Sequence, residues 1–303
     1  MTSLSHILNK PEYLYRPLQI LKRIAYRLNP PKTEREATVR LPWGVIIATT
    51  PREALGNSLL SFGVYELVVS EAIWRLTDPG DRCVDAGTNI GYMTSIMAIR
   101  CGSKGSVQSF EPHPAIFAKL KENVTRWNQS AMASRIAPIE LNPMALGSRR
   151  ATMRLCEPDG FSTNEGIASL APEGSGGHPV PVDRLDNLAS SASGYGIMKV
   201  DVEGAEFEVF EGSAKLLAGK QIRDIVYEDF SPYPSRCAVL LQKHGYTVFR
   251  LKKQLRGPQI LVPTNPLATS TSLNWEPVNY LATVDPRRAQ ERMQERGWKC
   301  LHA

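Results

Sequence analysis

The stretch CVDAGTNIGYMT, residues 83–94, decides the expected fold of this chain. Its apolar start ends in Asp85, Gly87 and Gly91 bracket a short turn, and a helix-like run follows. A glycine-rich turn between a strand and a helix is typical of a site for a nucleotide-containing group, because the missing side chains let the backbone approach the ligand. A nicotinamide dinucleotide, a nucleotide phosphate and S-adenosylmethionine are all candidates for that group.

The spacing of the glycines separates these candidates. A dinucleotide fingerprint would need glycines at 87, 89 and 92, where the chain has Gly87, Asn89 and Tyr92. The order D-x-G-x-x-x-G fits instead the nucleoside-methionine pocket of S-adenosylmethionine enzymes, since that cofactor carries no pyrophosphate. An acid at Asp85 suits the cationic part of this cofactor. The alternative interpretation is a tight turn with an exposed aspartate.

Strand and helix patterns alternate from about residue 60 onward. We predict strands over residues 82–87, 105–112, 136–147, 195–204, 222–230 and 246–252, and helices over 90–101, 114–128, 205–217 and 238–245. Nearly continuous apolar strands that alternate with helices indicate an α/β fold, with a mainly parallel sheet covered by helices on both faces. Because ligands of such sheets bind beyond the carboxyl ends of the strands, we expect the functional residues there.

Glu111 ends the second predicted strand, 26 residues after Asp85. A carboxylate can accept a hydrogen bond on each of its oxygens, so we predict that Glu111 binds both hydroxyls of a ribose. Such a contact indicates a nucleoside and does not by itself indicate a reaction. The alternative is an ordinary solvated acid that caps the helix beginning near Pro112.

Asp201, Glu203 and Glu206 lie within six residues at the end of a later apolar strand. Such a cluster is costly unless a cation, a metal ion or hydrogen-bond donors lie nearby. A sulfonium group together with the adjacent Lys199 would supply the positive charge. The alternative is that Glu203 and Glu206 only occupy the first turn of a helix, where acids are favoured by the helix dipole.

Four motifs in this order, DPGDRCVDAGTNIGYMTSIMA, FEPHP, NPMALG and IMKVDVEGAEFEVFEG, resemble the FkbM family of S-adenosylmethionine-dependent methyltransferases. The resemblance covers roughly residues 60–250. It implies a seven-stranded, Rossmann-like class I methyltransferase fold with a final antiparallel strand. It also implies O-methylation, commonly of sugar or macrolide hydroxyls.

The resemblance also assigns roles to residues at the matching positions. The NPMALG motif has no acid to bind the adenine amine, so adenine recognition is expected to depend on backbone groups. The implied contacts are Asp85, Ala86, Gly87, Asn89 and Gly91 at the methionine end, Glu111 and Pro112 at the ribose, Ala145 and Leu146 at the adenine, and Lys199, Asp201, Glu203 and Glu206 at the reacting side. A bulky side chain at Gly91 would then fill the pocket.

Transfer of a methyl group to a hydroxyl calls for a base that takes the proton. Asp201 or Glu203 is the expected base, and His113 and His178 are alternatives. A Mg²⁺ site formed by Asp201, Glu228 and Asp229 would have suitable oxygen ligands, but the spacing does not demand it. Two other functions compete with methyl transfer: a non-catalytic S-adenosylmethionine-binding module and a nicotinamide-dependent oxidoreductase.

The flanking segments differ from the central domain, which we place at residues 60–255. Residues 1–40 hold eight basic and three acidic side chains, a net charge of +5. Within them, one face of a predicted helix carries Leu18, Leu21, Ile24 or Ala25, and Leu28. We expect a basic extension over 1–59 whose helix docks on the core with its charged face solvated. Contact with an anionic membrane surface is the alternative, and no specific nucleic-acid partner is expected.

Two further segments break the alternation. Residues 157–179 are rich in Gly, Ser and Pro and are too long for an idle connection, so they form either a lid or a disordered insertion. Residues 256–303 are expected to be a tail with a short amphipathic helix.

Composition limits the class of protein. No run of 18 apolar residues and no secretion-signal core occurs in the sequence. Five scattered cysteines without a CxxC pair favour a reducing cytoplasm over a zinc site or a disulfide framework. We therefore expect a cytoplasmic enzyme that acts on a small-molecule or glycan acceptor.

Overall fold

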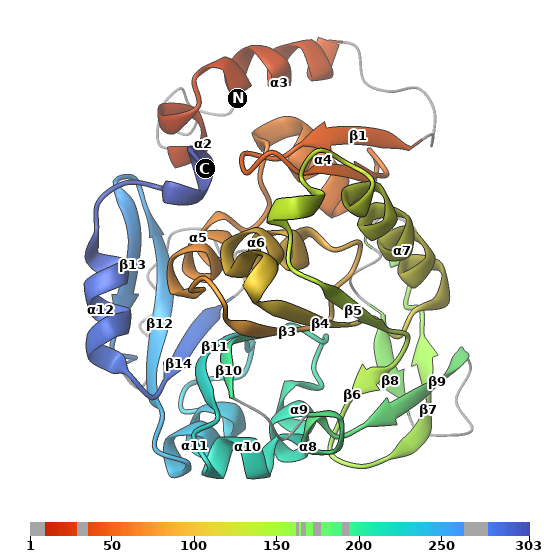
Figure 1. The fold of residues 1–303 in the computed structure, drawn as a ribbon, viewed down its shortest axis with the longest axis vertical. Coiled ribbons are helices and arrows are strands. Elements are labelled where there is room, and N and C mark those ends of the chain that lie inside the picture. Colours follow the sequence, from red (N-terminus) through yellow and green to blue (C-terminus); the bar gives the residue numbers. More distant parts are fainter. Residues whose placement is uncertain are drawn as a thin grey trace.

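The structure, a computed structural model, describes residues 10–28, 36–161, 164, 168–171, 177–189, 194–263 and 278–303. Its central sheet has eight strands: β3 (Arg82–Ala86), β4 (Ser106–Phe110), β5 (Ile139–Asn142), β10 (Tyr195–Val200), β11 (Ile222–Glu228), β12 (Thr247–Gln254), β13 (Gly257–Leu261) and β14 (Asn279–Thr283). Their order in the sheet is β13-β12-β14-β11-β10-β3-β4-β5 (Figure 1). Strands β5, β4, β3, β10 and β11 run parallel, which confirms the predicted mainly parallel α/β sheet.

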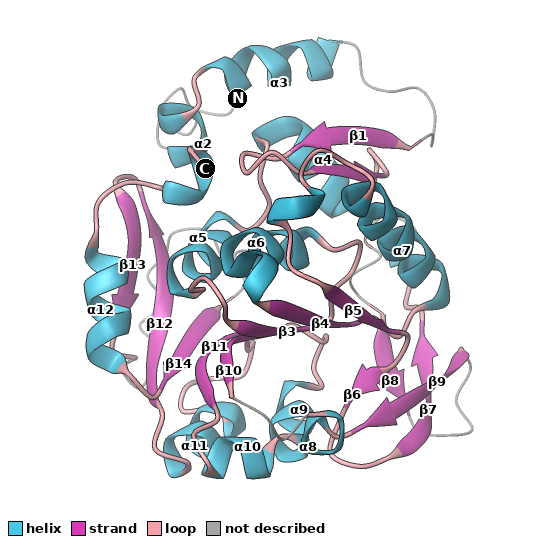
Figure 2. Ribbon diagram, in the orientation of Figure 1, coloured by secondary structure: helices cyan, strands magenta, loops and turns pink. Residues whose placement is uncertain are grey.

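Helices cover both faces of this sheet (Figure 2). Alternate residues of each central strand point to opposite layers: Cys83 and Ile197 pack in one core cluster, and Val84 and Met198 in the other. One layer contains α4 (Ala54–Phe62), α5 (Leu67–Leu76), α6 (Tyr92–Cys101), α7 (Pro114–Asn128) and α12 (Pro286–Gln294); the other contains α8 (Leu185–Leu188), α9 (Glu206–Gly212), α10 (Ala214–Ala218) and α11 (Arg236–Lys243). Burial on both faces is the reason that these strands read as continuous apolar runs.

The antiparallel side of the sheet holds one strand more than predicted. β14 is antiparallel to both of its neighbours, β11 and β12, as the family resemblance implied for the final strand. β13 adds an eighth strand, antiparallel to β12. No strand was predicted there because Pro258 lies inside it. Proline within a strand is typical of the edge of a sheet, which is where β13 lies. The domain boundaries after residues 59 and 255 stay predictions.

A second, four-stranded sheet lies between β5 and β10 in the chain. It consists of β6 (Ala145–Leu146), β7 (Ala151–Cys156), β8 (Ser169–Ala171) and β9 (His178–Asp183), in the order β6-β9-β7-β8. The strand predicted over 136–147 is therefore two strands, one in each sheet. The predicted lid falls partly on residues 162–163, 165–167 and 172–176, which lie outside the described residues.

The N-terminal region begins with α2 (Pro11–Tyr15) and α3 (Leu18–Leu28) and continues into a hairpin of β1 (Ala37–Arg40) and β2 (Ile46–Thr49). The side chain of Asn123 in α7 binds both the N–H and the C=O of Ala48 (2.8 and 3.1 Å), so the hairpin is anchored to the core. The expectation for α3 was wrong in one respect: its apolar face is exposed, with Leu18 and Leu28 exposed by 72 and 82%. No helix in the described part of the chain could cross a membrane.

Buried side chains of α5 hold the C-terminal segment. The Arg75 guanidinium donates hydrogen bonds to the carbonyls of residues 292, 295 and 297 at 2.6–2.8 Å. The Glu71 carboxylate, which pairs with Arg75 at 2.6 Å, accepts the N–H groups of Lys299 and Cys300 at 2.7 and 2.8 Å. Helix α5 is therefore fixed by residues more than 200 positions away in sequence.

Candidate active site

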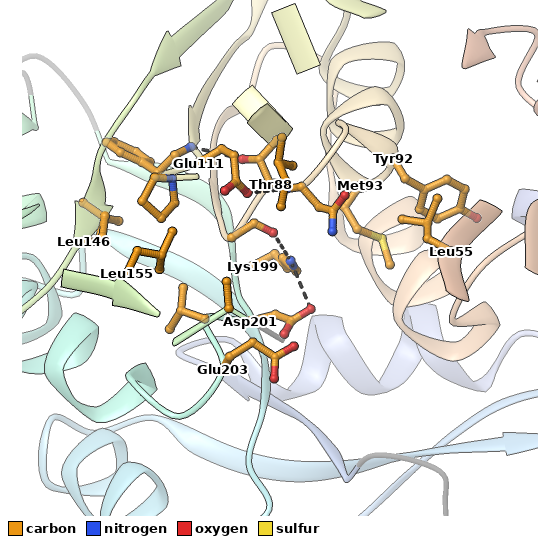
Figure 3. Close-up of a pocket in the computed structure, with 18 of the residues that line it drawn as sticks. Leu55, Thr88, Tyr92, Met93, Glu111, Leu146, Leu155, Lys199, Asp201 and Glu203 are labelled. Carbon is orange, nitrogen blue, oxygen red and sulfur yellow. Dashed lines mark hydrogen bonds and ion pairs between the residues drawn. The ribbon is translucent and has the colours of Figure 1, made fainter. Parts of the chain in front are cut away.

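A cavity that is partly open to solvent lies at the carboxyl ends of the central strands. Figure 3 shows Glu111 and Thr88 in one part of it and Asp201 and Glu203 in another, with Lys199 between them. These residues follow or end β3, β4 and β10, and the sheet order reverses between β3 and β10. The cavity therefore occupies the ligand position of doubly wound sheets.

The loop after β3 is shaped by left-handed backbone conformations at Gly87 (φ 76°), Asn89 (φ 51°) and Gly91 (φ 97°). Asn89 adopts this conformation readily because its own side chain accepts the N–H of Ile90 at 2.7 Å. A Cβ atom on Gly87 would lie 1.8 Å from the carbonyl oxygen of Asp201. Only glycine therefore allows the ends of β3 and β10 to approach each other this closely.

Glu111 is 6% exposed and lines the cavity. Its two oxygens accept the N–H groups of Asn89 and His113, both at 2.9 Å. Burial raises the pKa of this carboxyl to about 7, against the lowering effect of these two bonds. Each carboxylate oxygen still has a second lone pair, so the amides orient Glu111 without using up its capacity to accept ribose hydroxyls.

Asp85 and Lys199 form a buried pair beneath the loop. They are direct neighbours in the register of β3 and β10, and the Lys199 Nζ lies 3.8 Å from Asp85 and 3.2 Å from Asp201. The Lys199 ammonium also donates to the Gly87 carbonyl at 2.7 Å. Although burial opposes the charge, Asp201 and Asp85 raise the pKa of Lys199 above its ordinary range. Asp85 and Ala86 were expected to contact the ligand. Both are fully buried, and neither lines the cavity.

Besides Asp85, four more carboxyl groups form a cluster with Lys199: Asp201, which pairs with it, and Glu66, Glu203 and Glu228, which lie near Asp201. Burial raises the pKa of Glu203 to about 7, with Asp201 as the next cause. Burial and then the charge of Asp201 also raise the pKa values of Glu66 and Glu228. The cluster holds more potential negative charge than one lysine can balance, which suits a ligand that carries a cation.

Glu206 has a different place from the other acids. It is the first residue of α9, and its Oε1 accepts the N–H groups of Val202 and Gly204 at 3.1 and 3.2 Å. It does not line the cavity. The structure therefore agrees with the alternative interpretation for Glu206, an acid in the first helical turn, whereas Glu203 lines the cavity.

Apolar side chains form a wall of the cavity near Glu111. Pro112, Ala145 and Leu146, three of the positions expected near the nucleoside, all contribute to it. The sequence did not indicate Leu155 of β7 and Leu170 of β8, which extend the wall from the small sheet. Ala168 and Asn164, from the Gly- and Ser-rich insertion, also line the cavity.

Residues before β3 complete the cavity, and sequence reasoning missed them. Glu53, Leu55, Tyr65 and Glu66 all line it. Glu66, the N-cap of α5, has a left-handed backbone (φ 40°), and the Tyr92 hydroxyl accepts the N–H of the preceding residue at 3.1 Å. The one sequence feature that could have indicated Glu66 is its position as an acid inside the apolar run FGVYELVV. Unlike the cavity acids that were predicted, it does not lie at the end of a predicted strand.

Gly91 was expected to need a small side chain because it contacts the ligand, and this reason was wrong. Gly91 does not line the cavity, and a Cβ atom there would meet Leu120 at 2.8 Å and Trp127 at 2.9 Å. Its missing side chain makes room for α7 to pack, so a bulky residue would disturb the core before it reached a ligand.

The two histidines considered as bases lie outside the cavity lining. The Nε2 atoms of His113 and His178 both lie 3.0 Å from Oε1 of Glu157. These three residues are the one group in the described part of the chain that could hold a metal ion; Asp201, Glu228 and Asp229 do not form one. Nδ1 of His113 also accepts the N–H of Ile116 at 3.5 Å, so this histidine connects the start of α7 to Glu157.

The raised pKa values predict how stability depends on pH. A carboxyl with a pKa of about 7 in the folded chain and about 4.3 when unfolded binds its proton more tightly in the folded state. Its contribution to stability is complete below pH ~4.3 and is lost as the pH rises through about 7. For buried Glu111 this contribution is on the order of 3 kcal/mol. The melting temperature of the ligand-free protein is therefore expected to fall between pH 5 and 8.

Thermal unfolding of Glu111→Gln and Glu203→Gln should show a flatter pH dependence than that of the wild type. Glu122→Gln, which removes an exposed acid of α7 outside the cavity, is the control and should keep the wild-type slope. Equal slopes in all four proteins would contradict the proposed protonation of the cavity acids.

The comparisons with known proteins agree with this geometry. A sequence model of the Methyltransferase FkbM domain matches residues 85–248. The hexuronic acid methyltransferase AglP of Haloferax volcanii is 30% identical over 166 residues, which cover 48% of this chain and 62% of that protein. Methyltransferase 1 of Beauveria bassiana is 31% identical over 152 residues, which cover 43% and 57%. The chain thus spans less than two thirds of either curated relative.

Solved structures show weaker similarity. The FkbM methyltransferase of Methylobacillus flagellatus aligns with a TM-score of 0.41 and 15% identity over 75% of this chain and 52% of that one. A SAM-dependent O-methyltransferase of Thermotoga maritima aligns with a TM-score of 0.43 and 12% identity over 82% and 85%. The family assignment depends on the sequence match, which spans more than half of the residues: the chain belongs to the methyltransferase FkbM domain family.

Proposed function

We propose that this protein transfers the methyl group of S-adenosylmethionine to a hydroxyl group of a sugar, glycan or other small-molecule acceptor. The observation that carries the proposal is the cavity itself, which combines an oriented Glu111, an apolar wall and an acid cluster around Lys199. Family membership supports the reaction class. The name of the Haloferax volcanii relative, a hexuronic acid methyltransferase, supports a sugar hydroxyl as the acceptor.

The residues present fit this cofactor. Glu111 would accept the ribose hydroxyls, and the wall that includes Ala145 and Leu146 would contact the adenine. The Gly87 cradle permits close approach to the backbone, and the carboxylate of Asp201 would balance a sulfonium charge. When bound, the cofactor supplies an activated methyl group, so the protein mainly has to align the acceptor and relieve charge.

The acceptor hydroxyl must lose a proton, and Glu203 is the better placed of the two expected bases. Asp201 is held by Lys199 at 3.2 Å, whereas the Glu203 side chain has no hydrogen bond or ion pair among the described residues. A base works best when its pKa is close to the operating pH, and that of Glu203 is raised to about 7. We therefore assign proton removal to Glu203 and charge balance to Asp201.

Binding and turnover measurements test the function. Calorimetry should show binding of S-adenosylmethionine and none of NAD, because the loop lacks the dinucleotide spacing. Formation of S-adenosylhomocysteine with a panel of sugars and glycans should then identify the acceptor. Binding without turnover on every acceptor would favour a non-catalytic binding module, and binding of NAD would contradict the proposal.

Replacement of Glu111 is expected to weaken cofactor binding. Glu111→Ala removes charge-assisted hydrogen bonds, a loss of about 1.5–3 kcal/mol, which corresponds to roughly 10- to 150-fold in Kd. Glu140→Ala, an exposed acid on the neighbouring strand β5, is the control and should bind normally. Calorimetry with S-adenosylhomocysteine measures both, and an unchanged Kd in Glu111→Ala would place the ribose elsewhere.

A further inference from the structure

Helix α3 presents its apolar side to solvent. Leu18, Leu21, Ile24 and Leu28 are exposed by 72, 63, 48 and 82%. Their spacing of three or four residues places them on one face of the helix. Figure 1 shows α3 at the periphery of the molecule, beyond α4. An apolar stripe of this kind on the outside of a protein marks a contact site.

The polar side of α3 holds it to the protein. Gln19 donates to the carbonyl of Leu60 at 3.3 Å, and the Tyr26 hydroxyl donates to the carbonyl of Pro51 at 3.2 Å. The Arg23 guanidinium lies over the ring of Phe62, 5.0 Å from its centroid. This orientation is the reverse of that of an ordinary surface helix, which buries its apolar stripe and exposes its polar one. The exposed stripe is therefore left without a partner in the described chain.

The charge distribution identifies the kind of partner. Residues 1–40 carry a net charge of +5, and the whole chain carries +6. A partner with many negative charges is therefore favoured over an average protein surface. A short helix that combines an apolar face with basic residues has the composition of helices that lie in the interface of a bilayer. With 11 residues, α3 has a length of about 16 Å, so it can lie in the membrane plane but not span it.

We propose that α3 docks this protein on an anionic membrane surface. Leu18, Leu21, Ile24 and Leu28 would enter the boundary between headgroups and acyl chains, and the net positive charge of residues 1–40 would attract the anionic lipids. Helix α3 packs against α4, and α4 contributes Leu55 to the cavity. One helix therefore separates the docking face from the cavity.

Vesicle flotation with the full chain tests this docking. Vesicles of 30% phosphatidylglycerol in phosphatidylcholine are compared with pure phosphatidylcholine at low salt. Since each basic residue near an anionic surface contributes about 1 kcal/mol, the wild type is expected to bind the anionic vesicles at least ~10-fold more tightly. The double variant Leu21→Ser, Leu28→Ser should lose at least ~10-fold of that binding, because it removes two of the inserted side chains.

Further measurements separate docking from a general effect of apolar surface, from loss of folding and from self-association. Val239→Ser removes another exposed apolar side chain, 53% exposed in α11, and should bind vesicles like the wild type. Unchanged melting temperatures would show that both variants fold. Equal binding to both kinds of vesicle, or anionic binding that persists in the double variant, would contradict the proposal. So would a wild-type dimer in light scattering that the double variant abolishes, because α3 would then be a contact between two copies.

Discussion

Glu203→Gln is expected to lower the rate of methyl transfer by about 10²–10⁴, the usual effect of losing a general base. The substitution preserves the shape of the side chain, and Glu203 has no bonded partner among the described residues, so the fold and cofactor binding should stay unchanged. The loss should therefore appear in turnover and not in the Kd of S-adenosylmethionine. Because burial raises the pKa of Glu203 to about 7, the wild-type rate should increase with pH through neutrality, and the variant should lack this increase.

Asp201→Asn is the matched comparison for this prediction. Asp201 pairs with Lys199 at 3.2 Å, so its neutralisation should weaken cofactor binding as well as turnover. Addition of EDTA should leave the wild-type rate unchanged, since Asp201, Glu228 and Asp229 do not converge on a metal site. Full turnover of Glu203→Gln on a confirmed hydroxyl acceptor would remove Glu203 from the mechanism. Activity lost in EDTA and restored by Mg²⁺ would argue for a metal-assisted reaction.

Gly87→Ala should lower the free energy of unfolding by more than about 4 kcal/mol. Losses of this size occur only where a mutation has a specific structural cause. Two effects combine at this position. Alanine disfavours the left-handed φ of 76°, and its Cβ would lie 1.8 Å from the Asp201 carbonyl. The clash is with backbone at the end of β10, so relief would require the cavity to open. We expect both a lower melting temperature and loss of cofactor binding.

Gly204 offers a control in the same cavity region. It also has a left-handed backbone, with φ 94°, but nothing lies within 4 Å of a Cβ atom placed there. Gly204→Ala should therefore cost only the conformational strain, about 1–2 kcal/mol. Denaturant unfolding and calorimetry measure both variants. Equal losses in the two would show that the close approach at Gly87 does not matter.

The central sheet and the part of the cavity around Glu111, Lys199 and Asp201 could be predicted because their signals are local. Apolar strands that end in an acid or a glycine turn marked β3, β4 and β10, and the structure brings those ends together. Glu111, Lys199 and Asp201 were found for this reason. Asp85 was identified as important, but its burial beneath Lys199 depends on strand register, which the sequence does not show.

The rest depends on contacts between distant parts of the chain. Glu66 enters the cavity through the placement of α5, which the C-terminal segment fixes. Gly91 looked like a ligand contact, whereas its neighbours in space are Leu120 and Trp127 of α7. The outward apolar face of α3 could not be predicted either, because periodicity shows that a helix has two faces and does not show which one is buried.

The attachment of α5 to the C-terminal segment also affects the order in which parts of the protein can fold during synthesis. Glu71 and Arg75 bind backbone groups of residues 292–300, which leave the ribosome long after α5 does. Until then, Glu71 and Arg75 can pair with each other but lack the backbone groups that bind them in the finished protein. Contacts so distant in sequence form late because the intervening loop must close first. During synthesis the part of the cavity rim that carries Glu66 therefore becomes rigid only after residues 292–300 have emerged.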